Sequence, residues 1–465
     1  MTPDELVALT ESRTGRGPCV MFAERKKGFQ ARLSAGGVTK ALVDRSGASL
    51  SVAMSPDHMP DAREVVAWAD AGGATGLNPE ATMGPDLRVL AHQALEITSE
   101  VLDELPGCQM PQPDAIQSAV AAVSGHVLGD SERTLRLSVA MEAWDQWVLT
   151  ASAAHGTSLE KRSLAFGYVV ALMTGTDDFS IGIAPFCPSR CPESLHGDIK
   201  TATESAISDA AKLCGAGSPD KTEYTVVFER YGPAEGFVHE ALGHCLEARH
   251  GSEGVFWNKI GAQVAGPDLT LVEDPAEEGS PVRYVRDDEG VPACRHTLIS
   301  QGVVSGFMHN RHTATVLGEE PNGHGRRGSY RMPALSRMAN TIALPGEHED
   351  GDLLDLAGHG LIINRALSGR AAVFSGEFSM IVLDADVLRA GRSVRKIKNF
   401  IMTGRLERCL PSCCVGRTSG NPLVGTCGLS QEQTVFVATR APRIMVPNIR
   451  IAGALTLNQV AAMLS

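Results

Sequence analysis

The amino-acid sequence predicts an α+β fold, and two kinds of apolar pattern indicate it. Residues 86–105 and 113–127 carry apolar side chains at helical spacing. The first 60 residues instead alternate short apolar runs with glycine-rich turns, as strands and hairpins do. Beyond about Leu269, short apolar segments separated by Gly, Asp and Glu continue to the C-terminus. We therefore expect a mixed N-terminal half and a β-rich C-terminal half.

A stretch containing Gly and Pro at 214–220 marks the expected boundary between the halves. Before it, residues 134–148 alternate like a pair of strands, and the Ala-rich segment 201–213 favours a helix. After it, residues 224–228 form a continuous β-branched and aromatic run, which indicates a strand. Because 465 residues suffice for two domains, we predict an N-terminal α/β domain, 1–215, and a C-terminal β-rich domain, 216–465.

Charge and hydropathy exclude several classes of partner. The net charge is −12 and no long Lys/Arg cluster occurs, which argues against nucleic acid or an anionic membrane as the main partner. The N-terminus is acidic and no apolar segment of a secretory signal follows it. The most apolar stretch, 164–173, is too short to span a bilayer. We expect a cytoplasmic protein.

Eleven cysteines are scattered along the chain, and most are expected to be buried thiols. Two groupings, Cys187 with Cys191 and the adjacent pair Cys413 and Cys414, raise the alternative of a second metal site. Neither grouping has the spacing of a zinc knuckle, so ordinary thiols are the favoured interpretation.

One segment carries the residue types of a hydrolytic metal site: His239 and His244, with Glu240 next to the first histidine. Residues five apart on an ideal α-helix are separated by about 140°, too far to share one ion. A π-type turn would return both histidines to one face, and Gly243 would ease the distortion. The spacing therefore predicts a locally irregular helix. The residues alone leave open a buried helix with two hydrogen-bonded histidines.

The segment 236–247, Gly-Phe-Val-His-Glu-Ala-Leu-Gly-His-Cys-Leu-Glu, resembles the signature helix of the TldD/PmbA metallopeptidase family, on its metal-bearing TldD side. Further segments of similar sequence follow in order: 287–292, 322–330, 333–340, 425–428 and 448–453. Several ordered matches are more specific than one motif. The resemblance covers roughly the C-terminal half, because the family's Gly-rich strands are not recognisable in residues 1–200.

The resemblance implies that His239, His244 and Cys427 bind Zn²⁺ and that Glu240 is the general base. Three protein ligands plus water is the coordination of a catalytic zinc, and a thiolate is a good zinc donor. Such a zinc lowers the pKa of its bound water and polarises the scissile carbonyl, while a carboxylate takes the water's proton. Without the resemblance, Cys427 would be interpreted as one more buried thiol.

Four further residues are weaker candidates. Glu247 lies three residues after His244, close enough to orient it, although a solvated helical glutamate fits equally. Arg326 and Arg337 could hold a substrate carboxylate or a developing oxyanion, or could be structural ion pairs in a loop. His324 lies between two glycines, where it could approach the substrate or simply be exposed.

Three functions follow from the resemblance and the motif. The first is a zinc peptidase for unfolded peptides or leader segments, acting as the catalytic half of a heterodimer with a metal-free TldE/PmbA-like partner. The second keeps the chemistry but changes the substrate: an N-deacetylase or amidase for an N-acylated small molecule or modified peptide in specialised metabolism, such as antibiotic biosynthesis. The third is a non-catalytic partner subunit, which the glutamate beside a ligand pair disfavours.

Overall fold

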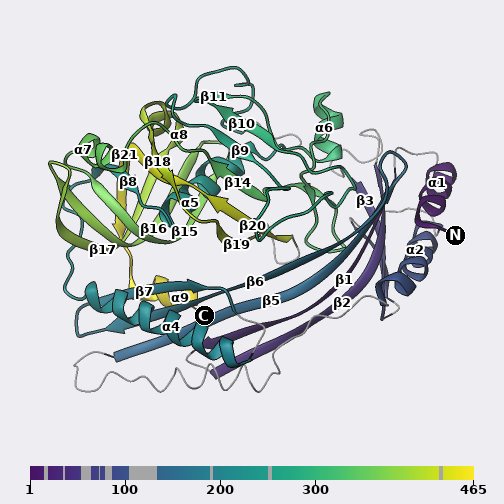
Figure 1. The fold of residues 1–465 in the computed structure, drawn as a ribbon, viewed down its shortest axis with the longest axis horizontal. Helices are drawn as coiled ribbons and strands as arrows, with labels where there is room; N and C mark the ends of the chain where they lie inside the picture. The colour runs from purple at the N-terminus through teal and green to yellow at the C-terminus, as the bar shows by residue number, and fades with distance from the viewer. Residues whose placement is uncertain are drawn as a thin grey trace.

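The structure is a computed structural model that describes residues 1–14, 19–34, 37–53, 64–72, 74–78, 86–103, 134–188, 192–249, 254–428 and 433–464. The predicted helix at 113–127 lies outside these residues. Figure 1 shows one long, curved sheet from the N-terminal half beneath a group of shorter sheets from the C-terminal half. The predicted α+β fold is confirmed.

The long sheet has seven antiparallel strands in the order β4-β3-β2-β1-β5-β6-β7. Its strands are β1 (Cys19–Ser34), β2 (Gly37–Ala53), β3 (Glu64–Asp70), β4 (Thr75–Asn78), β5 (Thr134–Ser152), β6 (Gly156–Thr174) and β7 (Phe179–Phe186). The prediction of two strands within 134–148 is wrong, because β5 is continuous and pairs with β6 along its whole length. No Gly or Pro interrupts its alternation, so nothing turns the chain before the hairpin turn at 153–155.

Among the described helices, α1 (Pro3–Thr14), α2 (Asp86–Asp103) and α4 (Pro192–Lys212) pack on this sheet, and so does Val460 of the C-terminal helix. Helices α1 and α2 bury Leu6, Val7 and Leu90 against β1 and β2. Helix α4 includes the predicted segment 201–213 and packs an alanine face on β6 and β7. A Cβ atom at Gly182 would lie 1.9 Å from the carbonyl oxygen of Ala206, so this close approach of helix to strand requires glycine.

The C-terminal half contains a closed ring of strands in the order β17-β16-β15-β8-β21, in which β21 pairs with β17, and β18 extends the sheet beyond β21. These strands are β8 (Glu223–Phe228), β15 (Leu361–Ala372), β16 (Glu377–Arg389), β17 (Arg392–Arg405), β18 (Cys414–Ser419) and β21 (Pro442–Ala454). The strand predicted at 224–228 is confirmed as β8. Strands β15, β16, β17 and β21 are longer than the short strands predicted for this half.

A second C-terminal sheet has the order β11-β10-β9-β14-β20-β19, and β12 and β13 form a small hairpin. Their bounds are β9 (Leu271–Glu273), β10 (His296–Ser300), β11 (Val303–Val304), β12 (Gly325–Arg326), β13 (Leu335–Ser336), β14 (Asn340–Ala343), β19 (Leu423–Gly428) and β20 (Thr434–Arg440). The helical segments are α5 (Pro233–Phe237), η1 (Val238–Leu242), η2 (Gly243–Leu246), α6 (Arg311–Leu317), α7 (Asp350–Ala357), α8 (Leu406–Cys409), η3 (Leu410–Ser412) and α9 (Leu457–Leu464).

The segment α5-η1-η2 lies in the main hydrophobic core, where it contacts strands of both C-terminal sheets. Phe237 stacks on Phe228 of β8 at a ring-centroid distance of 4.8 Å and meets the ring of Phe378 of β16 edge-on at 5.3 Å. Buried aromatic contacts of this kind fix the position of a short helix that its own propensity would not hold. The side chains that follow Phe237 are therefore carried on a rigid support.

All strands of the seven-stranded sheet end by Phe186, and every strand of the other sheets begins at or after Glu223. This separation supports 1–215 and 216–465 as proposed domains. Within the described ranges, no helix combines the length and the apolar character needed to cross a bilayer.

Candidate metal centre

The helix that carries the two histidines is distorted as the sequence predicts. Residues Val238–Leu242 form one π turn, in which the N–H of Gly243 donates to the carbonyl oxygens of Val238 and His239. The wider turn brings the rings of His239 and His244 to a centroid distance of 4.9 Å, with an interplanar angle of 74°.

Gly243 is needed for space and not for an unusual backbone conformation. Its φ and ψ angles are −55° and −50°, which any residue adopts in a helix. A Cβ atom at this position would lie 2.1 Å from the sulfur of Met338, so the glycine lets the helix approach that side chain. The predicted role of Gly243 in easing the distortion is replaced by one in packing.

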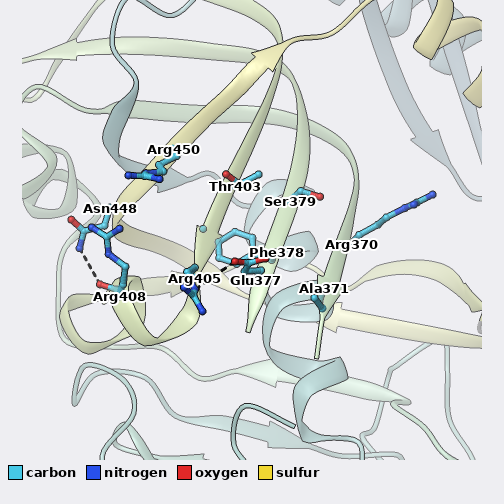
Figure 2. Close-up of a pocket in the computed structure, with 12 residues that line it drawn as sticks. Arg370, Ala371, Glu377, Phe378, Ser379, Thr403, Arg405, Arg408, Asn448 and Arg450 are labelled. Atoms are coloured by element: carbon cyan, nitrogen blue, oxygen red, sulfur yellow. Dashed lines mark hydrogen bonds and ion pairs between the residues drawn. The ribbon is translucent and has the colours of Figure 1, made fainter. Parts of the chain in front are cut away.

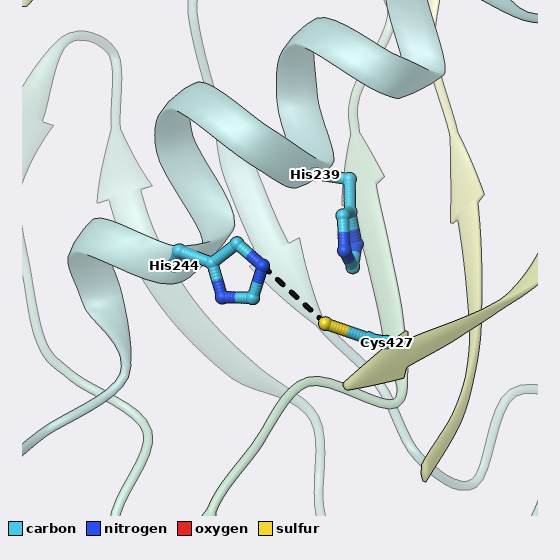
Figure 3. Close-up of side chains that lie close together, drawn as sticks. All are labelled: His239, His244 and Cys427. Atoms are coloured by element: carbon cyan, nitrogen blue, oxygen red, sulfur yellow. Dashed lines mark hydrogen bonds between the residues drawn. The ribbon is translucent and has the colours of Figure 1, made fainter. Parts of the chain in front are cut away.

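Cys427 on β19 faces the two histidines from across the site (Figure 3). Its Sγ atom lies 3.3 Å from Nε2 of His244, and the three residues each offer a ligand atom within 4.8 Å of the others. Burial alone would raise the pKa of the Cys427 thiol, but hydrogen bonds and charge from His239 and His244 lower it to about 5. The site therefore favours the thiolate.

The donor set fits zinc. Two imidazoles and a thiolate are ligands that Zn²⁺ prefers, and three protein ligands leave one position open. Nδ1 of His239 is buried and has no hydrogen-bond partner in the described part of the chain. A buried imidazole nitrogen without a hydrogen bond, next to a thiolate, is the arrangement expected of residues that bind a cation.

A buried ion-pair network holds His244 and the strand of Cys427. Oε2 of Glu247 lies 3.0 Å from Nδ1 of His244, which leaves Nε2 directed at Cys427. Oε1 of Glu247 accepts from Nε of Arg337 at 3.2 Å, and Nη2 of Arg337 donates to the carbonyl oxygen of Cys427 at 2.9 Å. Burial opposes ionisation of Glu247, but His244 and Arg337 hold its pKa well below its usual range. A carboxylate on the outer nitrogen fixes the tautomer and orientation of a ligating histidine.

The structure does not support the predicted substrate contacts of Arg326, Arg337 and His324. Arg337 is 1% exposed and Arg326 is 7% exposed, with its guanidinium on the carbonyl oxygens of Met338 and Phe436. His324 is fully buried, with Nδ1 2.9 Å from Oδ1 of Asn322. The loop folds inward because its arginines satisfy buried carbonyl groups, so all three side chains have positioning or structural roles.

Glu240 lies beside the three candidate ligands and lines a cavity of about 280 Å³ together with His239. Burial raises the pKa of its carboxyl, and His239 and His244 partly offset this rise. Strands β15, β19 and β20 supply short and apolar lining side chains, among them Ala366, Leu367, Val424, Thr426 and Val437.

Gly369 of β15 packs directly on Glu240, and sequence reasoning missed it. A Cβ atom at Gly369 would lie 2.9 Å from Cγ of Glu240. An isolated glycine within a strand is the available sequence signal for such a close approach. The bare backbone at this point sets where the Glu240 carboxylate can lie.

Gly369→Ala is expected to lower turnover by about tenfold or more with little change in zinc content, because a methyl group there displaces Glu240 and not the ligands. Steady-state rates and zinc per chain measured on the same preparation test this. Gly425→Ala is the matched control, since that glycine lines the same cavity and its Cβ atom would meet open space. Equal losses of turnover in both variants would contradict the inference that Gly369 positions Glu240.

A second cavity of about 540 Å³ shares β15 and β16 with the first but has different chemistry (Figure 2). Its lining includes four arginines, Arg370, Arg405, Arg408 and Arg450, and one acidic side chain, Glu377, which lies 3.6 Å from Arg405. The lining has no histidine or cysteine, so this cavity does not compete with the first as a metal centre.

The fold and the site together define an α+β protein with a donor cluster of two histidines on a π-distorted helix and one cysteine on the facing strand β19. A family model described as the PmbA/TldA metallopeptidase C-terminal domain matches residues 221–453, half of the chain. The chain therefore belongs to the PmbA/TldD family, which confirms the resemblance.

Curated relatives match about half of the chain. A protein named metalloprotease TldD homolog from Haemophilus influenzae is 30% identical over 220 residues, covering 46% of this chain and 45% of the relative. A zinc metalloprotease TldD homolog from Saccharolobus solfataricus is 26% identical over 220 residues, covering 47% and 49%. The matched region thus spans about half the length of these curated relatives.

Solved structures match nearly the whole chain. A modulator of a DNA gyrase from Thermotoga maritima aligns with a TM-score of 0.67 and 18% identity, covering 97% of this chain and 99% of that one. TldE from Thermococcus kodakarensis aligns with a TM-score of 0.65 and 14% identity, with the same coverage. At these identities the likeness shows the fold alone, and it extends over the N-terminal half.

Proposed function

We propose that this chain is a zinc-dependent amide-bond hydrolase, a metallopeptidase of the TldD type. The observation that carries the proposal is the meeting of His239, His244 and Cys427 beside Glu240, two of which, His239 and Glu240, line a cavity. The metalloprotease names of the curated relatives support it. When bound, Zn²⁺ supplies Lewis-acid chemistry, polarising a carbonyl and making water a stronger acid.

Glu240 acts as the general base in this proposal. Its carboxylate takes a proton from the attacking water, holds it at the oxygen, and passes it to the leaving nitrogen of the amide. Partial burial suits this role, because it raises the pKa of Glu240 toward the pH at which proton transfer in both directions is efficient. Glu247 and Arg337 keep His244 and the Cys427 strand in place during the cycle.

The lining and the volume of the cavity limit the class of substrate. Its short apolar lining accepts an acyl group or an uncharged side chain next to the scissile bond, as an unfolded peptide or leader segment would present. A volume of about 280 Å³ is also small, which favours an N-deacetylase acting on an N-acylated small molecule as the second candidate. Turnover of a peptide pool and of N-acetylated amines, measured in parallel, separates the two.

We also propose that the chain pairs with a TldE/PmbA-like subunit. The fold similarity to TldE supports this, since two chains of one fold can associate about a pseudo-two-fold axis as identical subunits do in a symmetric dimer. Co-expression with such a subunit, followed by size-exclusion chromatography and an activity assay of each fraction, tests whether the pair is the active form. A chain that is fully active alone and does not associate contradicts the pairing.

The first experiment is zinc per chain by elemental analysis, with Cys427→Ala beside the unmodified chain. We expect about one zinc at the catalytic cluster and its loss or sharp reduction in the variant, because two histidines alone bind zinc weakly. Cys294→Ala is the matched control, since that thiol is exposed and lies outside the cluster. An absence of zinc even after reconstitution with a partner overturns the ligand assignment. The hypothesis of a non-catalytic subunit would then be favoured.

A further inference from the structure

A second group of metal-ligand side chains lies outside the candidate catalytic centre. Asp268, His348 and Cys414 come from three segments that are distant in the sequence, yet one ligand atom of each lies within 4.8 Å of the others. Nε2 of His348 is 2.9 Å from Oδ2 of Asp268. Cys414 begins β18, His348 precedes α7, and Asp268 lies in the loop before β9.

Two glycines allow these segments to meet around Cys414. A Cβ atom at Gly266 would lie 2.1 Å from the carbonyl oxygen of Cys413, and one at Gly346 would lie 2.3 Å from that of Val415. Each loop thus crosses β18 at a residue next to Cys414, at a distance that only glycine permits.

Main-chain hydrogen bonds then fix both loops. The N–H of Gly266 donates to the carbonyl of Leu410 at 2.8 Å, and that of Gly346 to the carbonyl of Gly416 at 2.9 Å. The N–H of Arg417 donates to the carbonyl of His348 itself at 2.7 Å. The backbone of the segments that carry the three ligand atoms is therefore fixed by main-chain contacts.

The adjacent residues Cys413 and Cys414 have different surroundings. Cys413 is 2% exposed and belongs to the main hydrophobic core, whereas Cys414 is partly buried and close to Asp268. An ion pair between His348 and Asp268 accounts for two of the three side chains. Cys414 packs against a hydrophobic cluster that includes Val227 and Leu353, and its Sγ atom lies within 4.8 Å of a ligand atom of both ion-pair partners.

We propose that Asp268, His348 and Cys414 form a second binding site for a divalent cation that accepts sulfur and nitrogen ligands, such as Zn²⁺. One carboxylate, one imidazole and one thiolate are suitable donors, and the side chains of His348 and Asp268 are 31% and 18% exposed, which leaves room for water as a fourth ligand. The bound ion would join the loop before β9, the segment before α7 and β18, so it stabilises the fold and takes no part in hydrolysis.

The test uses Co²⁺ as a spectroscopic probe on the full-length chain carrying His239→Ala and His244→Ala, in which the catalytic cluster is disabled. We expect about one equivalent of Co²⁺ to bind with a thiolate-to-metal charge-transfer band. The band should disappear when Cys414→Ser is added and should persist when Cys294→Ser is added instead. Zn²⁺ should compete with Co²⁺ and raise the thermal midpoint of the background chain but not that of the Cys414→Ser variant.

Two results would overturn the proposal. One is a folded background chain, shown by an unchanged circular dichroism spectrum, that binds no Co²⁺ with a thiolate band. The other is a band that survives Cys414→Ser, which would place the ion elsewhere. His348→Asn guards against a misfolded serine variant, because it leaves the thiol intact and should still weaken Co²⁺ binding by tenfold or more, about the effect of losing a metal-site partner.

Discussion

Glu240→Gln is expected to lower kcat by about 100- to 10,000-fold while zinc per chain stays unchanged. The amide keeps the volume and the hydrogen-bonding shape of the carboxylate but cannot take a proton. Since Glu240 is not among the three clustered donors, the ligand set is untouched. Rates on a peptide pool, read by mass spectrometry, and elemental analysis of the same protein measure both quantities.

Glu235→Gln is the matched control for this variant. Glu235 lies on the same helical segment, lines the same cavity and is also buried, but its Oε2 caps the helix by accepting from the N–H of Gly232 at 2.7 Å. A glutamine oxygen can accept that bond, so turnover should stay within a few-fold of the original. Turnover that survives Glu240→Gln would remove Glu240 as the base, and equal losses in both variants would indicate a general effect of charge in the cavity.

The distorted helix was predictable from spacing alone. His239 and His244 are five residues apart, and only a widened turn places such a pair on one face. The structure has this turn at Val238–Leu242. Cys427 was named only through the family resemblance, because no local pattern distinguishes one thiol among eleven.

The contacts that position the cluster could not be predicted from the sequence. Glu247 and Arg337 are 90 residues apart, and their hydrogen bond depends on how two loops pack. A charged residue in a polar loop gives no sign of whether its side chain points inward, so the sequence leaves open whether Arg326 and Arg337 contact the substrate or form structural ion pairs. Burial, which the sequence does not encode locally, decides between those roles.

In the N-terminal half the fold resembles that of solved structures, although the sequence has no recognisable family signature. The family model matches residues 221–453, whereas the solved structures align with 97% of the chain. A long antiparallel sheet such as β5 and β6 needs alternating burial and matched lengths, and many sequences meet those conditions. The alternation therefore predicted strands there, although the individual residues carried no recognisable family signature.

Arg337→Met is expected to destabilise the protein by about 3–5 kcal/mol and to weaken zinc binding by about 10- to 100-fold. The substitution leaves the fully buried Glu247 carboxylate with less positive charge and removes the donor to the Cys427 carbonyl. Glu247 keeps contacts to His244 and Arg249, so the folded state should persist. Urea denaturation of the metal-free protein measures stability, and competition with a chromophoric chelator measures zinc affinity.

Arg326→Met separates a positioning role of Arg337 from a structural one. Arg326 is comparably buried and binds two carbonyl oxygens, but neither belongs to Cys427 and it has no bond to Glu247. Its loss should cost stability and leave zinc affinity within a few-fold, because the cluster keeps its supports. Arg337→Lys should retain part of the stability but not the affinity, since an ammonium cannot reproduce the planar fork that reaches Glu247 and two carbonyls at once. If the methionine variants of both arginines weaken zinc binding equally, the hydrogen bonds of Arg337 to Glu247 and Cys427 do not specifically position the metal centre.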